Sequence, residues 1–275
     1  MLDHAAGEGN FSRKLMDLLD RVEYRRVEST EDMEEVARIR YKAYKMADIL
    51  TLKGTTLIDD IDYDSHAYNF GVYFEERLIS TVRIHHVTPD HRVSSTRSVY
   101  PEEIDAFLDA GMSLIDPVRF AADPAIMREM PAIPYFTLRI ATMATDYFNA
   151  DRVLQLVSPQ HSAFYKRVFL ANTIVEPRKN CGKYNIELTL MSTDANAIRS
   201  DLYRRYPFFQ SEAFERRMMF ERGPNAGFTP LTILPTARFA SQQSRLAAAS
   251  NANQGLMGGS GNGLRNGGGR NGRAG

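Results

Sequence analysis

The chain has 275 residues, a formal net charge of zero and a single cysteine, Cys181, which excludes an internal disulfide and a zinc site built only from cysteines. No apolar run approaches the roughly 18 residues that a membrane-spanning helix needs, and the N-terminus lacks the pattern of a secretion signal. We therefore expect a cytoplasmic protein. Residues 1–222 carry five more acidic than basic side chains, which argues against a nucleic-acid partner.

The C-terminal residues 223–275 differ in composition from the rest of the chain. They contain five arginines but no Asp, Glu or Lys, and ten of the eighteen glycines lie between Gly255 and Gly275. Such a segment has too little apolar surface to offset the entropy that ordering costs. We expect residues 223–275 to be a disordered tail. Residues 1–222 should form one domain, with a core of about residues 22–192 and C-terminal helices in 194–222.

Hydrophobic periodicity and turn residues predict the elements of this domain. The first elements in chain order are a helix at 11–20, a strand at 22–27 and a helix after Ser29 with an apolar stripe over 33–47. Strands at 68–74, 78–87 and 112–120 follow, then a helix at 135–148 and a strand at 152–157. The last elements are a helix that opens at Ser158-Pro159 and runs through 161–170, strands at 173–175 and 184–191, and helices at 195–206 and 208–220. The mixture of hairpins and crossovers predicts an α/β fold with a mixed, mostly antiparallel central sheet flanked by helices.

Several charged residues stand where the pattern predicts burial. Arg40 lies on the apolar stripe of the second helix, an acidic loop covers residues 59–64, and Arg83 lies within a predicted strand. A charge on a buried face must be paired. Arg40, an aspartate of this loop, Arg83 and Asp116 are therefore candidates for a buried ion network, either beside a ligand site or without any ligand.

Four segments, in this order and spacing, resemble the GNAT superfamily of acyltransferases, and within it the N-acyl amino acid synthases and the acyl-homoserine lactone synthases. They are Arg40-Tyr41-Lys42-Ala43-Tyr44, the acidic loop 59–64 with Arg83 on the following hairpin, Asp116-Pro117-Val118-Arg119-Phe120, and Phe164-Tyr165-Lys166-Arg167. The resemblance implies a GNAT-like fold over about residues 22–192. It also implies an enzyme of lipid biosynthesis, of a bacterial type, that moves a long-chain acyl group to the amino group of an amino acid.

The resemblance also implies roles for single residues. The catalytic residues would be Tyr165, which protonates the departing thiolate, and Asp116, which holds or deprotonates the amine. A backbone amide near Val118–Phe120 would stabilise the oxyanion. The expected substrate-binding residues are Arg40, Tyr44, Asp62, Arg83, Arg119 and Phe120. Pro117 lacks a backbone donor, so the strand is expected to bulge or splay there. No metal site is expected.

The acyl donor follows from a departure from the superfamily pattern. Ordinary GNAT enzymes carry a glycine-rich loop for the coenzyme A pyrophosphate after the fourth strand, whereas this chain has Ala121-Ala122-Asp123-Pro124. We therefore expect no permanently bound cofactor, and a donor carried on the phosphopantetheine of acyl carrier protein. Basic residues suited to docking that acidic partner are Lys166, Arg167, Arg178, Lys179 and Lys183. Association with a membrane surface is expected only through the acyl product.

Two other functions remain open from the sequence. One is an acyl-homoserine lactone synthase that uses S-adenosylmethionine, although the chain lacks the tryptophan that those enzymes usually carry near the first-helix aromatic. The other is a non-catalytic GNAT-like module that binds a partner through its Arg-, Gly- and Asn-rich tail.

Overall fold

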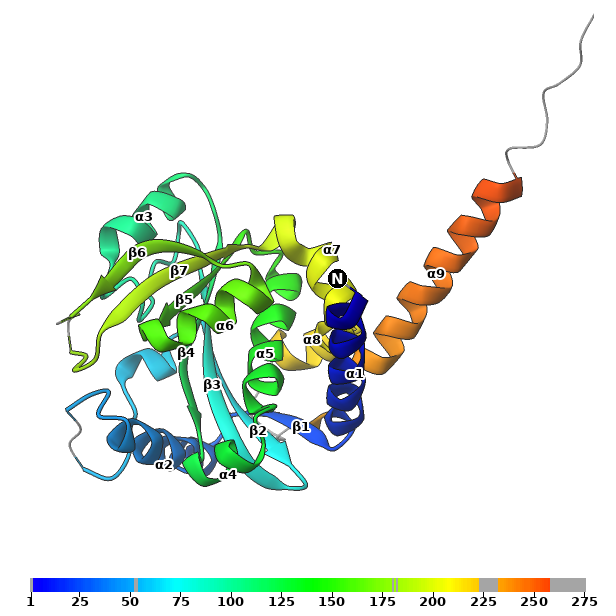
Figure 1. The fold of residues 1–275 in the computed structure, drawn as a ribbon. Helices are drawn as coiled ribbons and strands as arrows, with labels where there is room; N and C mark the ends of the chain where they lie inside the picture. The colour runs from blue at the N-terminus through cyan, green and yellow to red at the C-terminus, as the bar shows by residue number, and fades with distance from the viewer. Residues whose placement is uncertain (1, 52–53, 180, 182, 223–231, 258–275) are drawn as a thin grey trace, which may run out of the picture.

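The computed structural model describes residues 2–51, 54–179, 181, 183–222 and 232–257. These residues form an eight-stranded sheet with helices on both faces (Figure 1). The strands are β1 (Val22–Arg26), β2 (Ala67–Phe74), β3 (Arg77–Val87), β4 (Leu114–Ala122), β5 (Arg152–Val157), β6 (Asn172–Arg178), β7 (Leu188–Asp194) and β8 (Thr232–Ile233). Their order across the sheet is β6-β7-β5-β4-β3-β2-β1-β8.

The helices alternate with these strands along the chain. They are α1 (Leu2–Leu19), α2 (Thr30–Met46), α3 (Pro101–Asp109), α4 (Pro124–Glu129), α5 (Ile133–Phe148), α6 (Pro159–Phe169), α7 (Ala195–Arg205), α8 (Ala213–Phe220) and α9 (Ala237–Met257), with short 3-10 turns η1 (Asp60–Tyr63) and η2 (Pro207–Phe209). Within the described residues, no helix combines the length and apolarity needed to cross a membrane.

The predicted fold class is confirmed. Neighbouring strands pair antiparallel except β4 and β5, which are parallel and are joined through α5. The sequence patterns did not predict α3 and α4, although each begins with a proline, Pro101 and Pro124, at its first turn. Proline is favoured there because the first turn of a helix needs no N–H donor from it.

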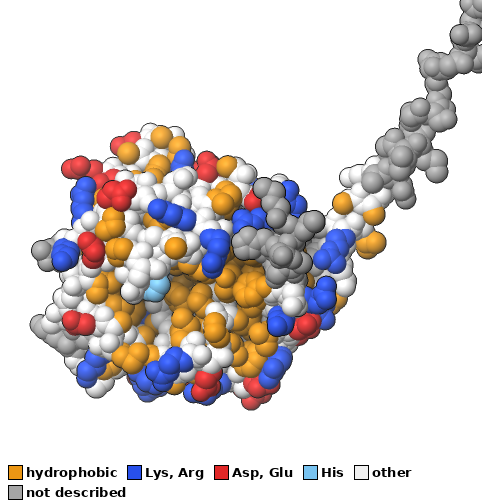
Figure 2. Space-filling model, in the orientation of Figure 1, with side chains coloured by type: hydrophobic (Ala, Val, Ile, Leu, Met, Phe, Trp, Pro, Cys, Tyr) orange, Lys and Arg blue, Asp and Glu red, His pale blue; other side chains and the backbone are white. Residues whose placement is uncertain are grey.

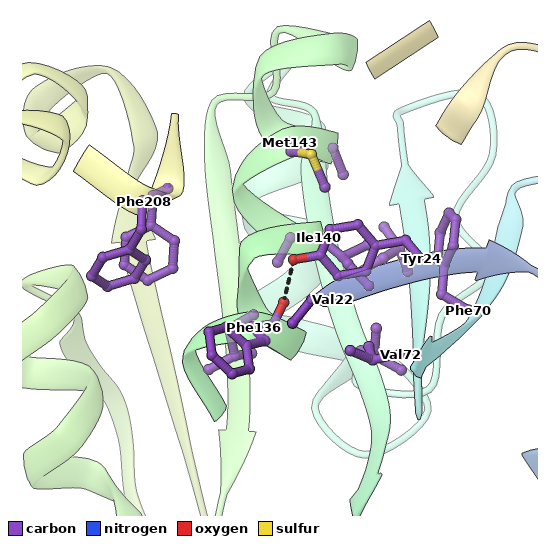
Figure 3. Packing of buried hydrophobic residues seen from close by; sticks show 14 of the residues in the cluster. Val22, Tyr24, Phe70, Val72, Phe136, Ile140, Met143 and Phe208 are labelled. Carbon is purple, nitrogen blue, oxygen red and sulfur yellow. Dashed lines mark hydrogen bonds between the residues drawn. The ribbon is translucent and has the colours of Figure 1, made fainter. Parts of the chain in front are cut away.

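The largest core lies between α5 and one face of the sheet. Tyr24, Phe70 and Phe136 are fully buried there, and the Tyr24 hydroxyl donates a hydrogen bond of 3.0 Å to the Phe136 carbonyl oxygen (Figure 3). A buried hydroxyl without a partner would cost free energy. A smaller core under α3 includes Val87 and Leu154, whose positions in their strands put them on the opposite face.

Strands β4 and β5 separate after two residue pairs. Their register is Leu114 opposite Arg152 and Ile115 opposite Val153, and the pairing ends there although both strands continue. The next residues of β4 are Asp116 and Pro117, so the expected splay is confirmed at the expected place. A bulge also occurs in β4, because the pairing with β3 shifts register between Thr81 and Arg83.

The C-terminal segment differs from the expected disordered tail at residues 232–257, which form β8 and α9. Ile233 is buried and pairs with Tyr24 of β1. The Thr236 backbone N–H donates to the Glu215 carboxylate at 3.0 Å, its hydroxyl bonds the same oxygen, and Glu215 pairs with the fully buried Arg139. A buried ion pair needs additional hydrogen bonds to offset its desolvation. The hydrogen bonds from Thr236 to Glu215 therefore help to hold this segment in place.

Beyond its first turn, α9 extends away from the sheet (Figure 1). Residues 242–251 are exposed. The remaining residues of the expected tail, 223–231 and 258–275, lie outside the described residues.

Two truncations test this division of the C-terminal segment. Ending the chain after Ser244 removes exposed helix and should change the free energy of unfolding by only about 0.5 kcal/mol. Ending it after Arg222 removes the Thr236 donors and the buried Ile233, and should cost about 3–5 kcal/mol. Urea unfolding of both chains beside the full-length protein measures the difference. Equal stability of all three would show that β8 and Thr236 contribute nothing.

Candidate active site

Three buried charges form the centre of the candidate site. Asp62 of η1 lies between Arg40 of α2 and Arg83 of β3, and one of its carboxylate oxygens is 2.8 Å from a guanidinium nitrogen of each arginine. All three side chains are 0% exposed. Arg40 also donates to the Asn69 side-chain oxygen at 2.7 Å, and Arg83 donates to the Ser95 hydroxyl at 2.6 Å. These partners offset the desolvation of the charges.

Asp59 extends this network towards the solvent. It accepts a hydrogen bond of 2.7 Å from Arg83 and pairs with Arg119, and the Lys183 ammonium is 3.6 Å from it. Burial alone would raise the pKa of Asp59, but Arg83 and Arg119 hold that pKa well below its usual range. Because the pKa is lower in the folded state, this stabilisation is present above the unfolded pKa and is lost as the pH falls. We call Arg40, Asp59, Asp62, Arg83 and Arg119 the ion cluster.

Arg119 is the member of the ion cluster that lines a cavity at the gap between β4 and β5. It has a positive φ of 56°, an uncommon conformation for a side chain of this size, within the bulged part of β4. Its Nη2 pairs with Asp59, whereas its Nη1 is buried without a hydrogen-bond partner among the described residues. An unpaired buried guanidinium nitrogen is a donor available to a ligand.

The space beside Arg119 is an open depression, which we call the cleft, with about 870 Å³ of space not filled by atoms when the solvent at its mouth is included. It lies where β4 and β5 separate. Residues of β4, β5 and α6 make most of its wall, together with residues near the end of α2 and at or before the start of β7. They are Tyr44, Ile49, Pro117, Val118, Arg119, Phe120, Leu154, Gln155, Leu156, Val157, Ser158, His161, Tyr165, Tyr184, Ile186 and Leu188. The structure therefore brings the predicted residues Tyr44, Arg119, Phe120 and Tyr165 together around one cavity.

A second cavity lies on the other face of the sheet, between α5, α6 and α7. It is narrow, with about 510 Å³ of space not filled by atoms when the solvent at its mouth is included, and its exposed wall is almost entirely apolar. We call it the inner pocket. Pro117, Gln155 and Tyr165 line both cavities, so the two meet at the gap between β4 and β5. Figure 2 shows hydrophobic side chains gathered in a hollow at the centre of the face that carries α6, with Lys and Arg side chains around it.

Tyr165 stands at this junction. Burial raises the pKa of its hydroxyl, so the group stays protonated at neutral pH. We find no hydrogen bond from this hydroxyl to any described residue. Its aromatic ring packs on Phe164 and Phe169 in α6, with ring centroids 5.2 and 6.0 Å away, which fixes the ring in place.

Asp116 lies beneath the loop that precedes α3. Its carboxylate accepts hydrogen bonds from the Thr96 hydroxyl at 2.6 Å and the Thr96 backbone N–H at 3.2 Å, and the side chain is 0% exposed. Burial raises the pKa of Asp116. No ion pair joins it to Arg40 or Arg119. In this conformation Asp116 holds the loop through Thr96, and it is not among the residues that line the cleft described above.

The residues expected to dock acyl carrier protein do not share one environment. Lys166, Arg167, Arg178 and Lys179 are exposed. Lys183 is exposed as well, but its ammonium also contacts Asp59 of the ion cluster. Among the described residues, no group of three or more His, Cys, Asp or Glu is arranged to hold a metal ion.

Several residues that line the two cavities had no predicted role, and three of them are polar or aromatic side chains that could contact a ligand. His161 and Tyr184 line the cleft, and Gln155 lines both cavities. Burial lowers the pKa of His161, whose Nδ1 lies 3.0 Å from the Ser158 hydroxyl, so the ring is neutral at pH 7. Gln155 gave a usable signal, because it is a polar residue in the middle of the apolar strand Val153–Val157. Tyr184 stands in no comparable pattern that could have marked it.

Replacing Asp62 tests the centre of the ion cluster. In Asp62→Asn, Arg40 and Arg83 lose the carboxylate between them, and we expect the free energy of unfolding to fall by about 3–5 kcal/mol. Asp60→Asn in the same turn is the matched control, because Asp60 is exposed and should matter by less than about 0.5 kcal/mol. Urea denaturation measures both, and equal stability of the two variants would contradict this description of the cluster.

Comparisons with known proteins place this geometry in a family. The family model described as N-acyl amino acid synthase FeeM matches residues 35–194. The solved structure of FeeM, an N-acyl amino acid synthase from uncultured soil microbes, aligns with a TM-score of 0.54 and 20% identity, over 66% of this chain and 94% of that chain.

A second solved structure, of the CoA-dependent acyl-homoserine lactone synthase BjaI with MTA, aligns with a TM-score of 0.50 and 14% identity, over 64% of this chain and 83% of that chain. At these identities the solved structures support the fold alone. A search of curated proteins gives no significant match. The family match covers more than half of the chain, so this protein is an acyltransferase that belongs to the N-acyl amino acid synthase FeeM family.

Proposed function

We propose that this enzyme transfers a long-chain acyl group from acyl carrier protein to the amino group of an amino acid. The observation that carries the proposal is the junction of two unlike cavities at the gap between β4 and β5. The cleft contains a guanidinium that can bind a carboxylate, and the inner pocket has an apolar wall that can hold an alkyl chain. An N-acyl amino acid has one group of each kind, joined at an amide.

Arg119 is the proposed ligand of the acceptor carboxylate. Arg40 and Arg83 are fully buried and bound to Asp62. Arg83 also holds Asp59, which is the partner of Arg119. Arg119 retains an unpaired donor and lines the cleft beside Tyr44 and Tyr184. A carboxylate there would complete the hydrogen bonds of a guanidinium that the ion cluster already orients.

The chemistry requires one bond to form and one to break. The neutral amine attacks the thioester carbonyl carbon in the gap, the new C–N bond forms, and the C–S bond breaks. Backbone amides in the bulged segment Val118–Phe120 are the proposed donors to the oxyanion. The amine releases a proton as the amide forms, and the Tyr165 hydroxyl, which burial keeps protonated, donates one to the departing thiolate. Water in the cleft, which opens to solvent, is the proposed acceptor of the amine proton.

Acyl carrier protein is favoured as donor by the start of α4. Ordinary enzymes of this fold bind the coenzyme A diphosphate near this turn. Here the Asp123 carboxylate accepts a hydrogen bond of 2.9 Å from the Ala125 backbone N–H and contacts the Lys42 ammonium at 3.0 Å. A diphosphate would meet this carboxylate where it needs free N–H groups. The phosphopantetheine arm of a carrier protein makes no such demand.

The donor preference gives the first test of the function. Mass spectrometry of reactions with acyl carrier protein thioesters and the twenty common amino acids should detect N-acyl amino acids, at higher rates than with the matching acyl coenzyme A. Reversing the exposed charges of Lys166, Arg167 and Lys179 to Glu should raise KM for the carrier-protein donor, because the acidic partner loses its attraction.

The control for this test reverses three basic residues away from α6, Arg38, Lys45 and Arg77, which are also exposed. We expect little change in KM from these substitutions. Equal rates with both donors, or equal effects of the two sets of reversals, would contradict the assignment of the donor.

A second test addresses Tyr165. Tyr165→Phe removes the proposed proton donor and should lower turnover about 100-fold, while the melting temperature stays nearly constant because the hydroxyl bonds to no described residue. Turnover and melting are measured on the same preparation. Tyr63→Phe, an exposed tyrosine outside the cleft, is the control. Full activity of Tyr165→Phe would remove the residue from the mechanism.

A further inference from the structure

Gln155 is a buried polar residue at the junction of the two cavities. It lies on β5 between Leu154 and Leu156, is only 4% exposed, and lines both the cleft and the inner pocket. An amide in such a place must satisfy its oxygen and its nitrogen, because an unpaired polar atom in an apolar setting costs free energy. The hydrogen bonds around the side chain determine whether its amide nitrogen or its amide oxygen has a partner.

The nitrogen of the Gln155 amide is bound to Thr193. Gln155 Nε2 lies 3.0 Å from the Thr193 hydroxyl oxygen, and that hydroxyl in turn donates its only proton to the Phe169 carbonyl oxygen at 3.2 Å. The hydroxyl can therefore only accept from Gln155. An amide oxygen placed opposite it would be repelled, so the network itself assigns the orientation of the amide.

The oxygen of the amide is left without a partner. Gln155 Oε1 is buried and has no hydrogen bond to any described residue. Two neighbouring hydroxyls of the inner pocket are satisfied internally, since those of Thr142 and Thr145 donate to the carbonyl oxygens of Arg139 and Ala141 at 2.8 and 2.7 Å. Gln155 thus presents an acceptor, with its donor end already used, at the entrance of an otherwise apolar pocket.

We propose that Gln155 selects acyl chains that carry a hydroxyl group close to the thioester, such as 3-hydroxyacyl chains. This inference rests on the proposed function, because it requires the acyl chain to pass from the gap between β4 and β5 into the inner pocket. A chain on that path brings its first carbons past Gln155. A hydroxyl on these carbons donates a hydrogen bond to Oε1, whereas a 3-oxo group offers a second acceptor and is disfavoured.

The test compares three carrier-protein donors of equal length in one reaction with the twenty common amino acids. They are the tetradecanoyl, 3-hydroxytetradecanoyl and 3-oxotetradecanoyl thioesters, and mass spectrometry of the products gives the ratios of kcat/KM. For the unaltered enzyme we expect the 3-hydroxyacyl chain to be preferred about 10-fold over the unsubstituted chain, which is the size of one hydrogen bond to an otherwise unsatisfied acceptor. The 3-oxoacyl chain should be the poorest of the three.

Two variants separate Gln155 from its surroundings. Gln155→Met keeps the length of the side chain without the acceptor, and should reduce the preference for the hydroxyl to about 2-fold or less. Thr193→Val releases the amide nitrogen and should weaken the preference partly. Thr189→Val is the matched control. Thr189 is on the same strand, its hydroxyl donates to the Val175 carbonyl oxygen at 2.7 Å, and it lines neither cavity, so the preference should be unchanged.

The outcomes distinguish this inference from the function on which it rests. Transfer of the unsubstituted chain with no preference for the hydroxyl in the unaltered enzyme would overturn the role of Gln155 and leave the acyl transfer standing. An equal loss with all three donors in Gln155→Met would also overturn it, because Oε1 would then bind the pantetheine arm that the donors share. No N-acyl amino acid from any donor would instead contradict the proposed function.

Discussion

The separation of β4 from β5 is the constraint on which the site depends. Only two residue pairs join these strands before they part at Asp116 and Pro117. Proline has no backbone N–H to donate, so a continuous ladder is disfavoured at the point where the gap begins. Because the gap passes through the sheet, it connects the cleft with the inner pocket, which the strands otherwise separate. Without it the cleft and the inner pocket would be unrelated features of opposite faces.

The division of labour between the two faces follows from charge and burial. On one face, two carboxylates pair with three arginines and leave one net positive charge, and these ion pairs offset the desolvation of the guanidinium that lines the cleft. On the other face, α5, α6 and α7 surround an apolar space. An amphiphilic product matches this arrangement, since each end meets the environment that its own solvation favours.

The sequence predicted the sheet, most helices and the pairing of Arg40 and Arg83 with aspartates of the acidic loop, because apolar periodicity and charges on buried faces are visible in a sequence. It did not predict that Arg119 joins this network and that Asp116 stays outside it. Arg40 on an apolar stripe required a partner, and its partner is an aspartate of the acidic loop. The role of Asp116 was less predictable. Its position beside Pro117 suggested an open cleft, but the loop carrying Thr96 covers it, and residue spacing cannot show where a loop folds back.

Composition alone also did not predict the ordered part of the C-terminal segment. Ile233 and Thr236 lie in a stretch poor in charge and rich in small residues, yet β8 completes the sheet and Thr236 satisfies a buried carboxylate. Glu215 needs these hydrogen bonds because it is buried, and it can be buried because it pairs with Arg139 on α5. Such a chain of polar requirements links residues far apart in sequence and leaves no local pattern. Gln155 shares this property, because its importance depends on Thr193 having already used its proton.

The central claim is that the acceptor and the acyl chain occupy opposite faces of the sheet and meet in the gap between β4 and β5. A crystal structure of the enzyme with an N-tetradecanoyl amino acid tests it most directly. The account predicts that the carboxylate contacts Arg119 in the cleft and that the alkyl chain passes Pro117, Gln155 and Tyr165 into the inner pocket. A ligand with its chain along the outer surface and the inner pocket unchanged would contradict it.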